Sequence, residues 1–180
     1  MKAALELFLE RGYDAVTAAE IAAHAGVTER TYFRHFPDKR EVLFDGERQL
    51  TEWVTDALAS VPADVPLWPT IRRTVDLIVP PLEANRPDSD RLAAIVAATP
   101  ALRERAVSKE ARLVAIITDL LVGRGASADE AALVARTAWG VLGHAIGAWR
   151  AAPGTPLQQH VDRGFILLRD LVSARSRSAS

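Results

Sequence analysis

Apolar residues recur at helical spacing along almost the entire chain, and no segment alternates apolar and polar residues as a half-buried strand does. Proline and glycine interrupt these stretches at intervals, as they do between helices. A chain of 180 residues, 49% of them apolar, is long enough to bury one large helical core or two smaller ones. We therefore expect an all-α protein of about nine helices, with a three-helix head, a connecting helix and a body of about five helices.

The same interruptions predict where the parts of the chain begin and end. We expect the head at residues 1–44, the body at residues 45–175 and a disordered tail at residues 176–180, where apolar residues are scarce. Pro80 and Pro81 are expected to end a helix, because proline lacks the N–H that a helix interior needs. The predicted body helices cover residues 69–79, 88–98, 101–122, 128–151 and 157–174.

Composition argues against several classes of function. The sequence has no cysteine, which excludes disulfides, thiolate metal sites and cysteine nucleophiles. Its four histidines are scattered, and no glycine-rich phosphate loop follows a strand, so we expect no enzyme activity, no metal and no cofactor. No apolar run approaches about 18 residues and no charged-then-apolar leader precedes Leu5, so we expect a cytoplasmic protein without a membrane partner.

The segment from Thr17 to Phe36 has the spacing of a helix-turn-helix. Thr17 and Glu20 form a capping-box pattern at the start of its first helix, and Gly26 allows the left-handed backbone that a tight turn needs. Thr28 is placed to cap the second helix. The side chains expected to face inward are Ile21, Ala22, Ala25, Val27, Phe33 and Phe36.

A helix held in this way can place its outward side chains in the major groove of DNA. Arg30 suits the O6 and N7 atoms of guanine, Glu29 suits the N4 amino group of cytosine, and the Thr31 methyl group suits that of thymine. The side chains expected to contact phosphates are Thr28, Tyr32, Arg34, His35 and Lys39, and Thr17 at the start of the preceding helix completes the candidate DNA-binding set.

The charge of this segment supports nucleic-acid binding only weakly. Residues 28–40 hold four Lys or Arg against two Asp or Glu, whereas the whole chain has a net charge of −1. Any binding to phosphates must therefore come from a local patch. The alternative interpretation is a three-helix packing unit with a solvated, charged face.

The run AGVTERTYFRHFPDKREVL, together with the residues before it, resembles the DNA-binding head of the TetR family of bacterial transcriptional regulators. The residues that carry the resemblance are Gly12, Tyr13, Ile21, Ala22, Ala25, Gly26, Val27, Phe33, His35, Phe36, Pro37, Asp38 and Lys39. The positions that the resemblance assigns to DNA contact are Thr28, Thr31, Phe33, His35 and Lys39. The chain departs from the family at Phe33, where many members have tyrosine, and at Ala18 and Ala19, where others often carry Thr, Arg or Lys.

Three glycines weaken the helix expected at residues 128–151. Gly140, Gly143 and Gly147 lie on one helix face, and each costs about 1 kcal/mol relative to alanine. A close approach to another helix would offset this cost. With Val161 and Leu168 of the last helix, these glycines form the predicted dimer interface, and the family resemblance implies the same use of the last two long helices. The alternative is close packing inside one subunit.

Aromatic and apolar residues of the body are candidates for a ligand pocket, because such pockets combine apolar walls with a few polar groups. The candidate lining residues are Trp68, Ile95, Ile116 and Trp139, with Thr118 and His144 as polar groups. The alternative is that they are ordinary core residues, since Trp and Ile at helical spacing usually pack inside.

Together these features favour a homodimeric, ligand-responsive transcriptional regulator in the cytoplasm, associated with the nucleoid when bound. It would be a repressor that binds a pseudo-palindromic double-stranded DNA operator through residues 1–44. Residues 45–175 would dimerise and bind a small apolar or amphipathic effector of unknown identity. The alternative, from a different class, is a helical dimerisation or adaptor protein whose head has lost DNA binding. A steep salt dependence of binding to random duplex discriminates between the two.

Overall fold

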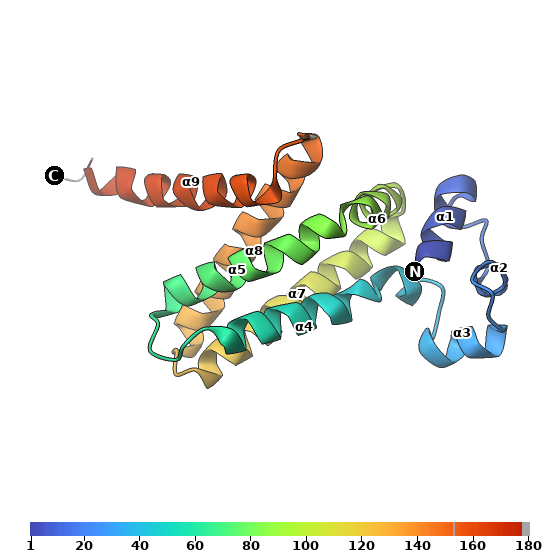
Figure 1. Ribbon diagram of the computed structural model, residues 1–180, viewed down its shortest axis with the longest axis horizontal. Coiled ribbons are helices and arrows are strands. Elements are labelled where there is room, and N and C mark those ends of the chain that lie inside the picture. The colour runs from blue at the N-terminus through green and yellow to red at the C-terminus, as the bar shows by residue number, and fades with distance from the viewer. Residues whose placement is uncertain (153, 178–180) are drawn as a thin grey trace. The chain divides into compact units, whose positions relative to one another are not determined.

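The computed structural model of the protein describes residues 1–152 and 154–177, apart from the side chains of residues 47 and 174–177. All regular secondary structure in these ranges is helical (Figure 1), which confirms the predicted all-α fold. The helices are α1 (Lys2–Arg11), α2 (Ala18–His24), α3 (Glu29–His35), the 3₁₀ helix η1 (Glu41–Phe44), α4 (Gly46–Ser60), α5 (Leu67–Ala84), α6 (Arg86–Ala98), α7 (Pro100–Gly123), α8 (Ala128–Ala151) and α9 (Leu157–Arg177). None of these helices is long and apolar enough to span a membrane.

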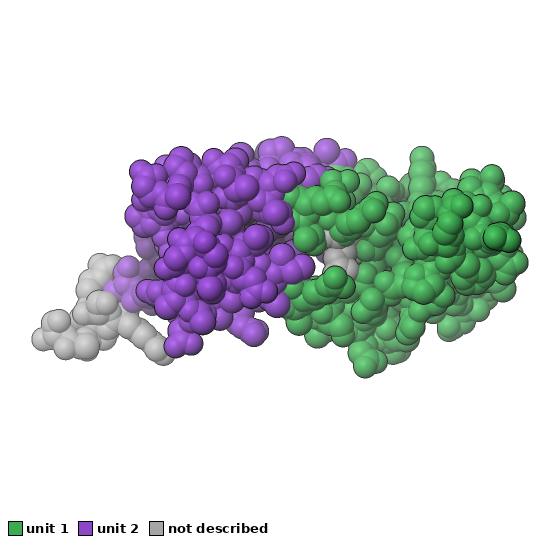
Figure 2. All heavy atoms as spheres, turned by 90° about the horizontal axis from the view of Figure 1, so that it is seen from below, with its two compact units in different colours: residues 1–52, 85–112 green, residues 53–84, 113–180 purple. Residues whose placement is uncertain are grey.

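The helices pack into two compact units (Figure 2). Unit 1 comprises residues 1–52 and 85–112, and unit 2 comprises residues 53–84 with the described part of 113–180. Packing therefore groups α6 and the first half of α7 with the head, whereas the sequence places the division after residue 44. The reason is that α1 contacts α6 directly and shares a core with it.

The turn between α2 and α3 forms as the sequence predicts. The Thr17 hydroxyl accepts a hydrogen bond from the Glu20 N–H at 3.2 Å, and the Glu20 carboxylate accepts from the Thr17 N–H at 2.8 Å, so the capping box is complete. Gly26 adopts a φ of 71°, a conformation that side chains with a Cβ rarely take. The chain then enters α3 with Thr28 as its N-cap.

The inward face of this motif differs from the predicted one at three positions. Ile21 and Ala22 are buried and Phe36 is half-buried, but the side chains of Ala25, Val27 and Phe33 are exposed. Tyr32 faces inward instead and is only 4% exposed. Successive helical residues point about 100° apart, so a buried Tyr32 turns the next side chain towards solvent.

The segment after α3 forms a short 3₁₀ helix before the long helix α4. The Asp38 carboxylate accepts hydrogen bonds from the backbone N–H groups of Arg40 at 2.7 Å and Glu41 at 3.2 Å, and the short helix η1 follows. The Glu41 carboxylate pairs with two cations of α7. It accepts two hydrogen bonds from the Arg105 guanidinium, at 2.9 and 3.1 Å, and lies 3.4 Å from the Lys109 ammonium. The long helix α4 therefore starts only at Gly46.

Unit 1 has one apolar core beneath the helix-turn-helix. Residues of α1, α2, α3, η1, α6 and α7 contribute to it. Its most deeply buried side chains are Ala4, Leu5, Phe8, Val16, Ile21, Ala22, Val42, Leu43 and Leu102. The head is thus supported by helices that follow it in the sequence by 40 residues or more.

In unit 2, α5 continues through two prolines. Pro80 and Pro81 lie inside α5, so the prediction that they end a helix is wrong. Tertiary contacts keep the last turn helical, because Ile78 and Val79 are buried and the Glu83 carboxylate accepts a hydrogen bond from the Leu157 N–H at the start of α9, at 3.1 Å. Such contacts routinely override local preference.

The last two helices, α8 and α9, make the most extensive packing contact of unit 2. They approach closely at Gly164, where an added Cβ would lie 2.9 Å from a methyl carbon of Val141. The buried side of α8 consists mainly of small residues, which allows this approach. Its buried members are Ala131, Ala135, Ala138, Leu142, Ala145 and Trp149.

The C-terminal end of α4 is held by a side chain from the turn after α7. The Arg124 guanidinium donates hydrogen bonds to the carbonyls of Leu58 at 3.3 Å, Val61 at 2.9 Å and Pro62 at 2.7 Å. The last carbonyls of a helix have no partner within the helix, so a cation at this end is favourable.

The tail expected to be disordered lies partly in α9. This helix runs to Arg177 and so includes residues 176 and 177. The remaining residues, 178–180, lie outside the described part of the chain.

The capping box of α2 makes the head sensitive to acid. Hydrogen bonds from the Thr17 N–H and hydroxyl, together with the Arg11 guanidinium at 2.8 Å, lower the pKa of Glu20 from 4.5 to about 2. A carboxylate whose pKa is lowered by folding stabilises the folded state fully above its unfolded pKa, and this contribution is lost as the pH falls to the folded pKa.

We predict that Glu20→Gln lowers the melting temperature at pH 7 and that the deficit shrinks between pH 4.5 and about 2. Protonated Glu20 resembles glutamine, so the two proteins converge in acid. Thermal melts followed by circular dichroism across this pH range measure the difference. A deficit that stays constant from pH 7 to pH 2 contradicts the prediction.

Candidate nucleic-acid interface and body cavity

Helix α3 is fixed at its N-terminus by its own threonines. The Thr28 hydroxyl oxygen accepts a hydrogen bond from the Thr31 N–H at 3.2 Å, and the two hydroxyl oxygens lie 3.0 Å apart. The Val27 N–H donates to the Ala22 carbonyl at 3.0 Å across the turn. These contacts set the direction in which α3 leaves α2. Thr28 and Thr31 therefore hold the helix, in addition to any contact with DNA.

The outward face of α3 carries charged and aromatic side chains. Glu29, Arg30, Arg34 and His35 are all exposed, as expected from the sequence. Within the described residues, neither the Arg30 nor the Arg34 guanidinium has a carboxylate partner. Phe33 lies on the same exposed face with 46% of its surface accessible. This face therefore offers two unpaired cations beside an aromatic ring.

Tyr32 does not belong to this face. Its side chain is buried, with ring centroids 5.3 Å from Phe36 and 5.5 Å from Phe33. Burial raises the pKa of Tyr32 to about 12, and its hydroxyl has no hydrogen-bond partner within the described residues. The expectation that Tyr32 contacts a phosphate is therefore wrong, because the inward turn of the helix removes the hydroxyl from the surface.

Lys39 is a structural cation of the head. Its ammonium donates to the carbonyls of Tyr13 at 2.9 Å and Val16 at 3.1 Å, and lies 4.3 Å from the centre of the Tyr13 ring. It therefore joins the segment after α3 to the loop after α1. One of its three donors is left for a phosphate.

The Thr17 hydroxyl is also engaged in hydrogen bonds within the head. It donates to the Glu20 carboxylate at 2.8 Å while accepting from the Glu20 N–H. In this arrangement the hydroxyl has no hydrogen left for a phosphate, since a hydroxyl has a single donor.

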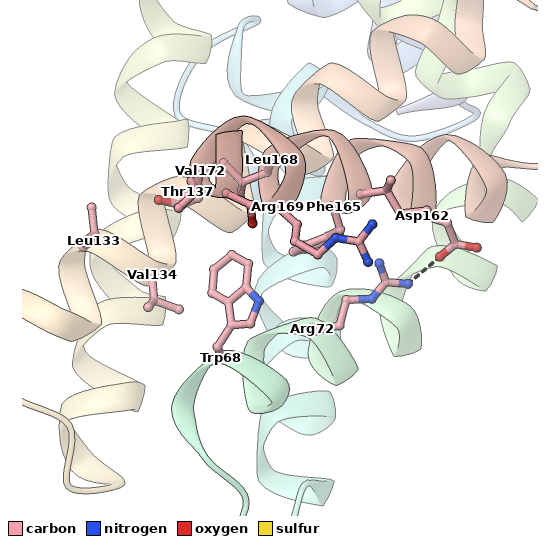
Figure 3. A pocket seen from close by; sticks show the side chains of 12 residues that line it. Trp68, Arg72, Leu133, Val134, Thr137, Asp162, Phe165, Leu168, Arg169 and Val172 are labelled. Carbon is pink, nitrogen blue, oxygen red and sulfur yellow. Dashed lines mark hydrogen bonds and ion pairs between the residues drawn. The ribbon is translucent and has the colours of Figure 1, made fainter. Parts of the chain in front are cut away.

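The body of the protein contains a cavity of about 930 Å³ in unit 2 (Figure 3). Trp68 and Arg72 line it from α5, and the Trp68 ring packs edge-on against Phe165 of α9 at 5.7 Å. The other walls are chiefly apolar. They are formed by Leu133, Val134 and Thr137 of α8 and by Asp162, Ile166, Leu168, Arg169, Val172 and Ser173 of α9.

The polar end of this cavity is an ion-pair cluster. The Arg72 guanidinium donates to Asp76 at 2.7 and 3.0 Å and to Asp162 at 2.5 Å, and lies 4.6 Å from the centre of the Phe165 ring. Gln158 donates to both carboxylates. Burial opposes ionisation of Asp162, but the hydrogen bonds from Arg72 and Gln158 hold its pKa below the ordinary value. The cluster is thus internally satisfied, and the rest of the cavity is free to take apolar groups.

Of the six residues expected to line a pocket, only Trp68 lines this cavity. Ile95 is buried in the core of unit 1, which places it in a different compact unit. The Thr118 hydroxyl donates to the Val114 carbonyl one turn earlier in α7, and His144 is exposed. Ile116 and Trp139 are half-buried elsewhere in unit 2. Spacing along a helix does not reveal which helices face each other, and α9 supplies most of the wall.

The residues expected at a dimer interface do not lie on one common surface of the subunit. Gly140, Gly143 and Gly147 are exposed, and a Cβ added to any of them meets nothing within 4 Å, so they do not pack closely inside the subunit. Val161 is 0% exposed and belongs to the interior of unit 2, so its assignment to an interface surface is wrong. Leu168 is half-buried and lines the cavity. Large apolar side chains are exposed on the same two helices at Leu133, Ile166, Leu167, Leu171 and Val172.

Comparison with known proteins places the head in a sequence family. The family model described as "Bacterial regulatory proteins, tetR family" matches residues 1–45. An uncharacterised HTH-type transcriptional regulator of Mycobacterium tuberculosis (strain H37Rv) is 39% identical over 64 residues, which are 36% of this chain and 32% of that protein. The HTH-type transcriptional regulator TcmR of Streptomyces glaucescens is 41% identical over 63 residues, 35% of this chain and 28% of that protein. The match thus spans about a third of the length of these curated relatives.

Solved structures share the fold over almost the entire chain. The TetR family transcriptional regulator PfmR from Thermus thermophilus superposes with a TM-score of 0.53 at 20% identity, covering 93% of this chain and 96% of that one. A putative TetR-family transcriptional regulator from Mesorhizobium loti gives a TM-score of 0.55 at 22% identity, covering 91% and 89%. The head is thus similar in sequence to the TetR family of bacterial regulatory proteins, and the chain shares its fold with solved structures of that family.

Proposed function

We propose that this protein is a sequence-specific DNA-binding transcriptional repressor that acts as a homodimer. The observation that carries the proposal is the outward face of α3, where the Arg30 and Arg34 guanidinium groups are exposed without carboxylate partners. Cations held free on a short, capped helix suit a polyanion that accepts the helix in its major groove. The match of residues 1–45 to the tetR family model supports the same conclusion.

The exposed side chains of α3 fall into two groups, those suited to base edges and those suited to phosphates. Arg30 lies in the first turn, where a recognition helix meets base edges, and its two parallel N–H groups match O6 and N7 of guanine. Glu29 beside it suits the cytosine amino group. Arg34 and His35 lie in the last turn and suit phosphates, which fix orientation without reading sequence. Thr28 and Thr31 cap the start of the helix, and Lys39 ties the segment that follows it to the loop after α1.

A second copy of the chain would present a second α3 to the same face of the duplex. A two-fold dimer reads half-sites about 34–36 Å apart, which accounts for the proposed pseudo-palindromic operator. Leu167 and Leu171 of α9, which are exposed and do not line the cavity, and the glycines of α8 that are open to solvent support these helices as the dimer surface. Burial of apolar area of this kind is what drives stable association.

Release from DNA is proposed to follow binding of a small apolar or amphipathic effector in the cavity of unit 2. Its apolar walls and single polar end suit such a molecule. The effector can shift the protein only by as much as its affinity differs between the DNA-binding conformation and another. By reciprocity, DNA lowers the affinity for the effector by the same factor. The site of action would be the bacterial cytoplasm and nucleoid.

An adaptor protein with a degenerate head is the alternative. The capped α3 and its unpaired arginines speak against it, since a head that no longer binds DNA has no use for exposed, unpaired cations.

We predict that Arg30→Ala and Arg34→Ala affect DNA binding in different ways. Arg30→Ala relaxes the preference at one base pair per half-site by about 1–3 kcal/mol, because one base contact is lost. Arg34→Ala weakens binding to all sequences alike and reduces the slope of log affinity against log salt by about one unit. Binding isotherms on duplexes selected from a random library, measured at several salt concentrations, give both quantities.

The matched control is Arg112→Ala, which removes an exposed arginine of α7 that does not line the cavity and is remote from α3 in sequence. This variant should bind as the parent does. A parent protein that binds no duplex even at low salt contradicts the proposal and favours the adaptor. A uniform loss from both α3 variants shows that Arg30 reads no base.

If α8 and α9 form the dimer surface, a substitution on that surface should give a folded monomer. Gly143→Arg places a long cation where the subunit leaves open space, so the fold of the subunit is kept while the close approach of two copies is blocked. Sedimentation equilibrium should show a dimer for the parent and a monomer for the variant, with the same helical content by circular dichroism. A variant that remains a dimer and gains stability shows that the glycines face only solvent.

If the cavity binds apolar ligands, substitution of two exposed leucines should affect ligand binding differently. Leu133 lines the cavity and is 68% exposed, whereas Leu77 of α5 is 52% exposed and is not among the lining residues. Leu133→Glu should weaken binding of the apolar anionic dye 1-anilinonaphthalene-8-sulfonate, because it removes apolar contact area and its carboxylate repels the sulfonate of the dye. Leu77→Glu should leave dye fluorescence titrations unchanged. Equal effects from the two variants contradict the assignment of the cavity.

A further inference from the structure

An exposed phenylalanine stands between the two unpaired arginines of α3. Phe33 is 46% exposed, although the neighbouring aromatic residue, Tyr32, is 4% exposed. The apolar stripe of α3 is therefore complete without Phe33. A second aromatic residue on the outer face is therefore not held by packing in the core, and its ring is open to contact with a partner.

The ring of Phe33 has a defined position. It meets the buried Tyr32 ring edge-on, with the ring planes at 88° and the centroids 5.5 Å apart, which is a favourable arrangement for aromatic pairs. Tyr32 is itself packed in the core of unit 1. Phe33 is thus supported from within on one side and open on the other.

The phenyl ring of Phe33 can contact few of the chemical groups that line the major groove. A phenyl ring has no donor or acceptor for a phosphate oxygen or for the polar edge of a base. The major groove presents one apolar feature, the C5-methyl group of thymine, and contact with it is the known way in which apolar side chains read a base. A ring on the outer face of the proposed recognition helix matches that methyl group and no other group in the groove.

The position along the helix relates Phe33 to Arg30. The two residues are three apart, which is about 4.5 Å along the helix axis, and they lie on the same face. Base pairs follow one another at about 3.4 Å along the duplex. A thymine methyl contacted by Phe33 therefore lies one or two base pairs from the guanine read by Arg30.

We propose that Phe33 is a specificity-determining residue that selects thymine by its C5-methyl group, next to the base read by Arg30. The inference rests on the proposed DNA binding through α3 and adds to it a base preference that uses no hydrogen bond.

The test removes the methyl group from the DNA and the ring from the protein. The full-length chain is first used to select bound duplexes from a random library. Each thymine of the selected duplex is then replaced singly by deoxyuridine, which lacks only the C5-methyl group. Affinities are measured for the parent protein, Phe33→Ala and Phe33→Tyr.

At one position per half-site we expect deoxyuridine to weaken binding of the parent about fourfold, the value of one buried methyl group. The same replacement should have no effect on Phe33→Ala, whereas Phe33→Tyr, which keeps the ring, should retain the sensitivity. The matched control is Leu9→Ala, which removes an apolar side chain of α1 with a similar exposure, 48%, and should keep the parent's response to deoxyuridine.

The outcomes separate this inference from the function on which it rests. Selection of a defined sequence without any effect of deoxyuridine, or with an effect that persists in Phe33→Ala, overturns the role of Phe33 and leaves DNA binding intact. Failure to select any duplex overturns both.

Discussion

The burial of Tyr32 in the core of unit 1 is the contact on which the use of the head depends. A seven-residue helix has little stability of its own, so its rotation about its axis is set by the side chain that it buries. With Tyr32 turned inward against Phe36, the following residues Phe33 and Arg34 face outward. The identity of the exposed face, and hence every proposed contact with bases, follows from this one packing choice.

Most other charged groups of the head serve its architecture. Lys39 holds two backbone carbonyls of the loop after α1, and Glu41 is held by Arg105 and Lys109 of α7. These contacts leave Arg30 and Arg34 as the arginines of α3 with no structural task within the described residues. A chain with a net charge of −1 thus presents a local cationic face without being a basic protein.

The unit that contains the head also contains α6 and the first half of α7, and unit 2 contains the cavity. The helices α4 and α7 each contribute residues to both units. These two helices give a covalently continuous connection between the unit of the head and the unit of the cavity. Coupling between the proposed sites therefore has a physical route.

Local signals in the sequence determined the helices, the capping box at Thr17 and the left-handed turn at Gly26, because these depend on residues within a few positions of one another. Only the tertiary structure decided which aromatic residue of α3 is buried, that α5 continues through Pro80 and Pro81, that Ile95 lies in unit 1, and that α9 supplies most of the cavity wall. Each of these depends on partners distant in the chain. Helical periodicity indicates that a residue is apolar and on a given face, but it does not specify what that face meets.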